Sequence, residues 1–333
     1  MITYRDSGVD IDAGNRTVEL LASAVASTAT DEVLEGGGGF GGLYAADGLG
    51  PGKVLVASTD GVGTKVALAA RYERWRGVGV DVVNHCINDI LVVGAEPRFF
   101  LDYIATSKLV PEVVVAIVAG MADACREAGC ALLGGETAEM PGVYAAGAVD
   151  VVGTIVGTAD RDGLLPRSEQ VREGDLLVGL PSSGPHTNGY SLIRRLIEDR
   201  ELPQAMIDRL LAPHRSYLPF IRSLQAQGVA LKALAHITGG GLVENLPRVL
   251  PSGLGVTVEL GSWEIPEPFV TLVDWSGIDD GEAFRTWNMG IGMAAVIDRL
   301  LGERAIESGC LEIGEVIPVE HGRDRVAFAG SWR

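Results

Sequence analysis

The sequence predicts an α/β protein, of the α+β kind, that is divided into two domains. Three observations lead to this fold class: the length, the composition, and a succession of strand and helix patterns that begins twice. With 333 residues, the chain is about twice as long as a typical domain. Hydrophobic residues make up 47% of it and glycines number 45, which is typical of a globular chain with many turns. A polar, proline-containing stretch at 159–174 separates the two patterns, so we predict domains at 1–160 and 170–333 and a linker at 161–169.

The net charge of −17 argues against nucleic acid or an anionic membrane as the main partner. The longest apolar run, at 113–122, is too short to span a bilayer, and no signal peptide is visible, so we expect a cytoplasmic protein. The four cysteines form no C-x-x-C pair and have no metal-binding spacing with the histidines. Buried free thiols are therefore expected.

The elements of the first half follow in chain order. Apolar residues at helical spacing follow Asn15, a suitable N-cap, and predict a helix at 15–28, whereas the glycines at 35–42 predict a loop. The clearest helix begins at Pro111, because proline suits a first helical turn, and ends at Gly129. The other elements expected here are strands at 54–58, 99–104, 130–133 and 150–158, and helical segments at 65–72 and 81–93.

The second half repeats the alternation of strands and helices. A strand at 176–180 is followed by a polar loop at 182–189 and a helix at 190–198, and a strand at 231–237 leads through three glycines to a helix at 242–250. Strands at 255–260, 290–297, 313–319 and 325–329 complete this domain.

The segment Thr-Asp-Gly-Val-Gly-Thr-Lys at 59–65 directly follows the apolar strand at 54–58. Its glycines let backbone N–H groups approach a phosphate, Asp60 can hold a hard cation, and Lys65 can neutralise a phosphate oxygen. The order of residues is not that of a P-loop. The alternative is a glycine turn with a solvated lysine.

Two further acidic positions favour a ligand site. Asp89 lies in a largely apolar segment, where a buried carboxylate needs a cation, a metal or a helix-capping role. Beside Asp60 it would give Mg²⁺ two oxygen ligands, although capping explains it equally well. Glu136 and Thr137 follow two glycines at a predicted strand end, where open α/β sheets bind ligands.

Glycines and one histidine suggest further contacts. The glycine-rich loop satisfies G-x-G-x-x-G but lacks the strand before it that a dinucleotide fold requires, so a lid or an inert linker is expected. Gly239, Gly240 and Gly241 stand between a strand and a helix and could seat a phosphate or serve close packing. His186 is the best histidine for chemistry because its loop is polar, whereas His236 lies in an apolar strand and suits a core position. We assign no role to the remaining histidines of the second half.

Together these segments resemble the phosphoribosylformylglycinamidine cyclo-ligases, also called aminoimidazole ribonucleotide synthetases. The resemblance spans nearly the whole chain and rests on nine segments in order. They are YRDSGVDIDAGN at 4–15, GGFGG at 38–42, TDGVGTK at 59–65, CIND at 86–89, GAEPRFFLDY at 94–103, GGETAEMPG at 134–142, SSGPHTNGYSL at 182–192, ITGGGLVENLPR at 237–248 and WNMGIGM at 287–293. Each segment alone is weak, but nine in order are specific.

The resemblance implies a reaction and an assembly. Family members use ATP and Mg²⁺ to phosphorylate the formyl oxygen of formylglycinamidine ribonucleotide, and ring closure of the resulting iminophosphate expels phosphate. The products are ADP, phosphate and 5-aminoimidazole ribonucleotide, in de novo purine biosynthesis. The resemblance also implies a homodimer in which the N-terminal domains, with flanking helices, share a β-barrel, and a C-terminal mixed β-sheet covered by helices.

The resemblance further implies roles for individual residues. Asp60 and Asp89 would hold Mg²⁺, and both, with Lys65 and His186, would be catalytic. Ser183 and Asn188 would line the substrate site, whose phosphate would be seated by Gly239, Gly240 and Gly241. ATP would be bound by Gly38, Gly39, Phe40, Gly41, Gly61, Val62, Gly63, Thr64, Lys65, Asn88, Glu136 and Thr137.

Some positions depart from the family pattern: Arg5 stands where lysine is usual, His85 where methionine is more frequent, and Trp287 where phenylalanine is more familiar. None of these touches the two aspartates. The rivals are the related formylglycinamidine synthetases, selenophosphate synthetases and thiamine monophosphate kinases, or a non-catalytic nucleotide-binding dimer. The first are far longer, the second carry a reactive residue near the N-terminus whereas the first cysteine here is Cys86, and the third lack the segments at 134–142 and 182–192.

Overall fold

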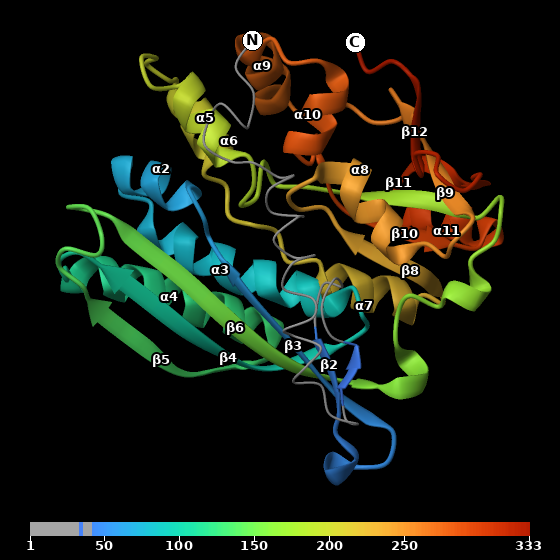
Figure 1. Cartoon of the computed structure of the whole chain (residues 1–333), viewed down its shortest axis with the longest axis horizontal. Helices are drawn as coiled ribbons and strands as arrows, with labels where there is room; N and C mark the ends of the chain where they lie inside the picture. The colour runs from blue at the N-terminus through green and yellow to red at the C-terminus, as the bar shows by residue number, and fades with distance from the viewer. Residues whose placement is uncertain (1–32, 36–41) are drawn as a thin grey trace.

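The computed structural model describes residues 33–35 and 42–333. The helix expected at 15–28 and the loop residues Gly38, Gly39, Phe40 and Gly41 therefore lie outside the described residues. In the described part, strands form two six-stranded sheets (Figure 1).

The first sheet has the strand order β1-β2-β3-β6-β4-β5. Neighbouring strands are antiparallel, apart from the parallel pair of β4 and β5. The strands are β1 (Val33–Glu35), β2 (Gly42–Ala45), β3 (Lys53–Gly61), β4 (Glu96–Thr106), β5 (Ala131–Glu139) and β6 (Val149–Asp160). The sheet is open, and the described residues form no closed barrel.

Helices α3 (Trp75–Leu91) and α4 (Pro111–Ala128) cover one face of this sheet, and α2 (Lys65–Arg71) follows β3 (Figure 1). Glycines allow the close packing. A Cβ atom on Gly79 of α3 would lie 1.9 Å from the carbonyl oxygen of Ile117, and one on Gly120 of α4 would lie 2.0 Å from that of Arg76. In β6, a Cβ on Gly153 would lie 2.0 Å from the ring of Phe100. Glycine at these three positions therefore lets neighbouring segments approach more closely than a side chain would allow.

Within the described residues, the elements predicted for the first half are confirmed in type but not in every boundary. The helix from Pro111 ends at Gly129, whose φ of 76° is the left-handed conformation that glycine adopts easily. For the strand at 130–133, the composition predicted a short and buried element, and this prediction was wrong in both length and burial. The observed β5 runs to Glu139 and is largely exposed, because it is the edge strand and pairs only with β4.

The second sheet is mixed, as expected, with the order β12-β9-β11-β7-β10-β8. Only β12 and β9 are parallel. Its strands are β7 (Leu176–Pro181), β8 (Leu231–His236), β9 (Leu254–Leu260), β10 (Ile291–Ile297), β11 (Leu311–Pro318) and β12 (Val326–Gly330). Every residue of β10, an interior strand between β7 and β8, is buried, so the core of this half lies around it.

Short helices surround the second sheet. They are α5 (Tyr190–Leu196), α6 (Gln204–Leu210), α7 (Leu218–Ala226), α8 (Gly241–Asn245), α9 (Glu267–Ser276), α10 (Asp280–Thr286) and α11 (Gly302–Glu307). The sequence did not predict α6, α7, α9, α10 or α11, because one to three turns give too little periodicity. The helix predicted at 242–250 changes to a 3₁₀ turn at Leu246–Val249, where Pro247 has no N–H to donate.

Two further predictions, on the cysteines and on membrane-spanning segments, can be compared with the described residues. All four cysteines are free thiols; Cys86, Cys125 and Cys310 are buried and Cys130 is half-buried. Among residues 33–35 and 42–333, no helix has the length and apolar character needed to cross a membrane.

Candidate active site

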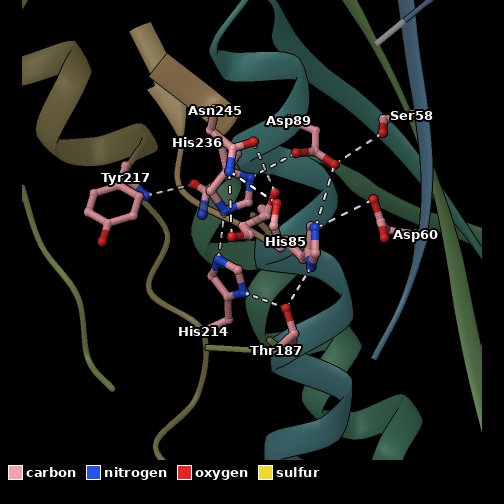
Figure 2. A network of polar contacts seen from close by, with 12 residues as sticks. Ser58, Asp60, His85, Asp89, Thr187, His214, Tyr217, His236 and Asn245 are labelled. Atoms are coloured by element: carbon pink, nitrogen blue, oxygen red, sulfur yellow. Dashed lines mark hydrogen bonds and ion pairs between the residues drawn. The ribbon is translucent and has the colours of Figure 1, made fainter. Parts of the chain in front are cut away.

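Asp60 and Asp89 lie together around one histidine (Figure 2). Asp60 is near the end of β3, and Asp89 follows His85 by one turn on the buried helix α3. The His85 Nε2 atom is 3.4 Å from Asp60 Oδ2 and 3.8 Å from Asp89 Oδ2. Ser58 Oγ donates to Asp89 Oδ2 at 3.2 Å. The structure thus brings the two predicted metal ligands together, although they are 29 positions apart.

A ring of polar contacts connects this point to the second half of the chain (Figure 2). The histidine ring, as we call it, consists of Asp89, His236, His214, Thr187 and His85. The Nδ1 atom of His236 lies 2.8 Å from Asp89 Oδ1, and the two Nε2 atoms of His236 and His214 are 3.0 Å apart. Thr187 Oγ1 closes the ring, 3.5 Å from His214 Nδ1 and 2.8 Å from His85 Nδ1. These residues come from α3, the loop after β7, the loop before α7, and β8.

Burial keeps the imidazoles of His186, His214 and His236 neutral. Desolvation lowers the pKa of His236 to about 3 and holds the pKa of His214 and His186 well below the usual value. The pKa of Asp89 is raised, first because of burial and further because of the nearby charge of Asp60. A cation held between the aspartates would offset this repulsion.

His186 is buried and lies next to His214, a member of the histidine ring. Its imidazole stacks on that of His214, with ring centroids 4.0 Å apart and planes inclined by 20°. The backbone N–H of Ser183 donates to His186 Nε2 at 3.3 Å, while His186 Nδ1 has no hydrogen-bond partner among the described residues. Ser183 itself donates through its hydroxyl to the carbonyl oxygen of Pro213 at 2.6 Å.

Lys65 does not point towards the two aspartates. Its Nζ atom is buried and donates to Asp81 Oδ1 at 2.8 Å and to the carbonyl oxygen of Ala212 at 2.9 Å. Burial lowers the pKa of Lys65 and raises that of Asp81 to about 6, and the contact between the two side chains opposes both shifts. In this arrangement Lys65 fixes the loop that carries His214, whose N–H also donates to Asp81 Oδ1.

The predicted phosphate segment turns tightly after Asp60. Gly63 has a φ of 65°, Val62 is fully buried, and the hydroxyl of Thr64 lies 3.1 Å from that of Ser191 in α5. Gly61 ends β3. The segment therefore lies at the contact between the two halves of the chain.

Asn88 connects the two halves instead of facing a cavity. Its side-chain amide donates to the carbonyl oxygen of Arg215 and accepts from the N–H of Tyr217. On the same helix, Asn84 donates to the carbonyl oxygen of His214 at 2.7 Å. The loop between α6 and α7 is thus held along α3.

Glu136 and Thr137 are not brought to the ring. They lie inside β5, and β6 and β4 separate β5 from β3. Two intervening strands correspond to roughly 14 Å between Glu136 and the level of Asp60 in β3. These two residues belong to the exposed edge of the first sheet.

Of the three glycines at the start of α8, Gly239 lies beside Asn188 and Gly241 packs closely against α10. A Cβ on Gly239 would lie 3.5 Å from Asn188 Oδ1, and one on Gly241 would lie 1.7 Å from the carbonyl oxygen of Phe284. Gly240 has a φ of 90°. Close packing therefore accounts for Gly241. Gly239 instead lies next to Asn188, which is in the same loop as His186.

Sequence reasoning assigned no site role to His85, Thr187, His214 or His236. The available signal was that the chain has only five histidines, and four of them are buried. A buried histidine in an acidic chain requires partners. The positions are too far apart in sequence to form a recognisable spacing, so only the fold reveals the ring.

Comparisons with known proteins match most of the chain to one family. Family models described as AIR synthase related protein match residues 42–159 with the N-terminal domain and residues 172–326 with the C-terminal domain. A phosphoribosylformylglycinamidine cyclo-ligase of Xanthomonas oryzae pv. oryzae is 46% identical, covering 98% of this chain and 99% of that protein. One from Desulfitobacterium hafniense is 49% identical over 89% of each chain. A solved structure described as AaThiL complexed with AMPPCP and TMP has a TM-score of 0.65 at 18% identity, covers 96% of this chain and 91% of that one, and is similar in fold.

Proposed function

This chain belongs to the AIR synthase-related family, and we propose that it closes the imidazole ring of formylglycinamidine ribonucleotide in de novo purine biosynthesis. It is an ATP-dependent phosphoribosylformylglycinamidine cyclo-ligase, like its relatives of 46–49% identity. The observation that carries the proposal is that this identity extends over nearly the full length. The convergence of Asp60 and Asp89 supports it, because phosphoryl transfer needs charge held in place.

The chemistry is a phosphorylation followed by an attack. The γ-phosphoryl group of ATP passes to the formyl oxygen, which turns a poor leaving group into phosphate. The ribosyl-bearing nitrogen then attacks the same carbon, phosphate leaves, and 5-aminoimidazole ribonucleotide and ADP remain. The protein contributes positioning and the exclusion of water.

The donor set fits a divalent cation, which we take to be Mg²⁺ with ATP. Asp60 and Asp89 supply carboxylate oxygens, the ligands that Mg²⁺ prefers, and a cation between them would offset the repulsion that raises the pKa of Asp89. Mg²⁺ would neutralise phosphate charge when bound. We further propose that Gly61, Val62, Gly63 and Thr64 contact phosphate through the turn that follows Asp60.

Lys65 is better placed as a positioning residue than as a phosphate contact. Its ammonium is held by Asp81 and by the loop that carries His214. We assign the substrate side to Ser183, His186 and Asn188, which share one loop. Burial holds the pKa of His186 well below its usual value, so this residue presents a neutral imidazole to the substrate side.

We propose a homodimer formed through the uncovered face of the first sheet, where two copies would complete the barrel of the family. Leu101 of β4 and Leu133 of β5 are 38% and 64% exposed on a sheet that helices cover on one face. Exposed leucines on an open sheet favour burial against a partner. This surface belongs to the N-terminal domain at 1–160, with the linker at 161–169 and the substrate domain at 170–333. Dependence on ATP favours a cytoplasmic location.

A direct assay tests the function. Purified protein with formylglycinamidine ribonucleotide, ATP and Mg²⁺ should form one aminoimidazole ribonucleotide and one ADP per phosphate released. ATP hydrolysis independent of the ribonucleotide, or no turnover, would refute the proposal. A parallel reaction with thiamine monophosphate tests the kinase alternative and should give no product.

A further inference from the structure

We propose that His85, Asp89 and His236, with Asp60 beside them, form a binding site for a divalent transition-metal ion of the zinc class. The inference rests on the proposed function only in that it shares Asp60 and Asp89 with the expected Mg²⁺ position. It concerns which ion these residues select.

The separations between the donor atoms match such an ion. Bond lengths of 2.0–2.1 Å in a tetrahedron place neighbouring ligand atoms about 3.3 Å apart. The separations here are 2.8 Å from His236 Nδ1 to Asp89 Oδ1, 3.4 Å from His85 Nε2 to Asp60 Oδ2, and 3.8 Å from His85 Nε2 to Asp89 Oδ2. The donor atoms of His85, Asp89 and His236 all lie within 4.8 Å of one another.

The orientation of the two imidazoles also suits a shared ion. The rings of His85 and His236 are nearly perpendicular, at 83°, with centroids 5.1 Å apart. Their lone pairs lie in the ring planes, so perpendicular rings can direct them to one point. A second group, His186, His214 and His236, is equally close but less suitable, because the stacked rings of His186 and His214 hold their lone pairs nearly parallel.

The outer contacts complete the site. A histidine ligand normally donates its second ring nitrogen to a fixed partner, which sets the tautomer. Here His85 Nδ1 lies 2.8 Å from Thr187 Oγ1, and His236 Nε2 lies 3.0 Å from His214 Nε2. If His236 Nε2–H donates to His214 Nε2, then His214 Nδ1–H and His85 Nδ1–H can both donate to the two lone pairs of Thr187 Oγ1. Every inward nitrogen is then free to bind metal.

The ligand types decide the class of ion. Two imidazole nitrogens with one or two carboxylates suit Zn²⁺, Co²⁺ or Mn²⁺, whereas Mg²⁺ takes oxygen ligands and keeps several waters. The two imidazoles together with the carboxylates therefore favour a transition metal, whereas Asp60 and Asp89 without the imidazoles offer Mg²⁺ the oxygen ligands that it prefers.

Metal titration of the stripped full-length protein tests the proposal. Calorimetry should show one Zn²⁺ per chain that a large excess of Mg²⁺ does not displace. Co²⁺ in place of Zn²⁺ should give the intense visible absorption of a four-coordinate ion with nitrogen ligands. A protein that retains no stoichiometric Zn²⁺ and gives only the spectrum of hydrated Co²⁺ would overturn the proposal.

Variants locate the site. His85→Gln and His236→Gln should each weaken Zn²⁺ binding at least about 100-fold, and Thr187→Val, which removes an outer contact, roughly 10–100-fold. The matched control is His321→Gln, since His321 is exposed and lies far along the chain, and its affinity should be that of the unaltered protein. Circular dichroism confirms that each variant is folded. Unchanged Zn²⁺ affinity in both folded variants, His85→Gln and His236→Gln, would refute the assignment.

The proposed function and the proposed metal site can be refuted independently of each other. Metal-stripped protein that forms aminoimidazole ribonucleotide with Mg²⁺ and ATP, yet binds no Zn²⁺, retains the proposed function and refutes the metal site. Metal-stripped protein that does not turn over with Mg²⁺ and ATP, yet binds Zn²⁺ through His85 and His236 in the titration, supports the site and refutes the function.

Discussion

His236 Nδ1 lies 2.8 Å from Asp89 Oδ1, and this contact joins a strand of the second sheet to a buried helix of the first half of the chain. Asp89 is nearly inaccessible, at 4% exposure, so its carboxylate depends on such partners. The contact places the predicted metal ligand at the boundary between the two halves. Changes near this boundary should therefore affect stability and activity together, and the following experiments separate the two effects.

Asp60→Asn should lower turnover of the ribonucleotide by roughly 10²–10³-fold and leave the fold intact, because one charge near the transferred phosphate is lost without a change in volume. Steady-state kinetics at saturating Mg²⁺ measure the effect. The matched control, Asp324→Asn, alters an exposed aspartate of the second half and should keep full activity. Near-normal turnover of Asp60→Asn would show that Asp60 is only structural.

Lys65→Met should destabilise the protein by about 3–5 kcal/mol, because it leaves the Asp81 carboxylate buried without its counter-charge. Urea unfolding measures the loss. The exposed pair of Lys53 and Asp160 provides the contrast, and Lys53→Met should cost no more than about 1 kcal/mol. A variant Lys65→Met of unaltered stability but reduced affinity for ATP would instead support the phosphate role predicted from the sequence.

The protein should lose stability as the pH falls below about 6.5. In the folded state the pKa values of His186, His214 and His236 are lowered, so the unfolded chain takes up protons there first, and the stability present above pH 6.5 is lost on acidification. Each histidine contributes roughly 1.4 kcal/mol per pH unit. The raised pKa of Asp81, about 6, acts in the opposite direction below that pH, and the raised pKa of Asp89 also acts in the opposite direction. Three histidines against two aspartates leave a net loss of about one proton's worth of stability.

Urea unfolding at pH 7.5, 6.5 and 5.5 measures this dependence. His214→Gln removes one of the three neutral imidazoles and should reduce the slope by about 1.4 kcal/mol per pH unit. Equal free energies of unfolding at pH 7.5 and 5.5 would contradict the prediction.

Gly79→Ala should destabilise the protein by about 1–3 kcal/mol, because its Cβ would lie 1.9 Å from the carbonyl oxygen of Ile117 and force α3 and α4 apart. Gly77 provides a control on the same helix, since a Cβ there meets nothing closer than 3.9 Å. Gly77→Ala should therefore stabilise the helix by up to about 1 kcal/mol. Thermal or urea unfolding compares the two, and a stabilised Gly79→Ala would show that the helices separate freely.

Leu133→Glu should convert the proposed homodimer to a monomer, because it places a charge on the exposed edge strand that the partner would cover. Sedimentation velocity gives the mass. Leu300→Glu is the control, since Leu300 is 92% exposed and lies beside the second sheet. A dimeric Leu133→Glu, or an unaltered protein that is already monomeric, would refute this surface as the interface.

The sequence determined the elements with strong local signals. Pro111 and Gly129 delimit α4 because proline and glycine restrict the backbone locally, and the strands were identified from runs of apolar residues. The nine segments identified the family for the same reason, since each is contiguous along the chain. Asp89 was identified because a carboxylate in an apolar setting requires a partner, and Asp60 because it stands in a glycine-containing segment at a strand end.

Only the tertiary structure decided which partners those acids have. His85, Thr187, His214 and His236 are spread over 152 positions, and packing of α3 against the loop before α7 brings them into one ring. It also turned Lys65 towards Asp81, because a buried ammonium binds the nearest buried carboxylate. Contacts between distant segments follow from how elements pack, and no local pattern of residues records them.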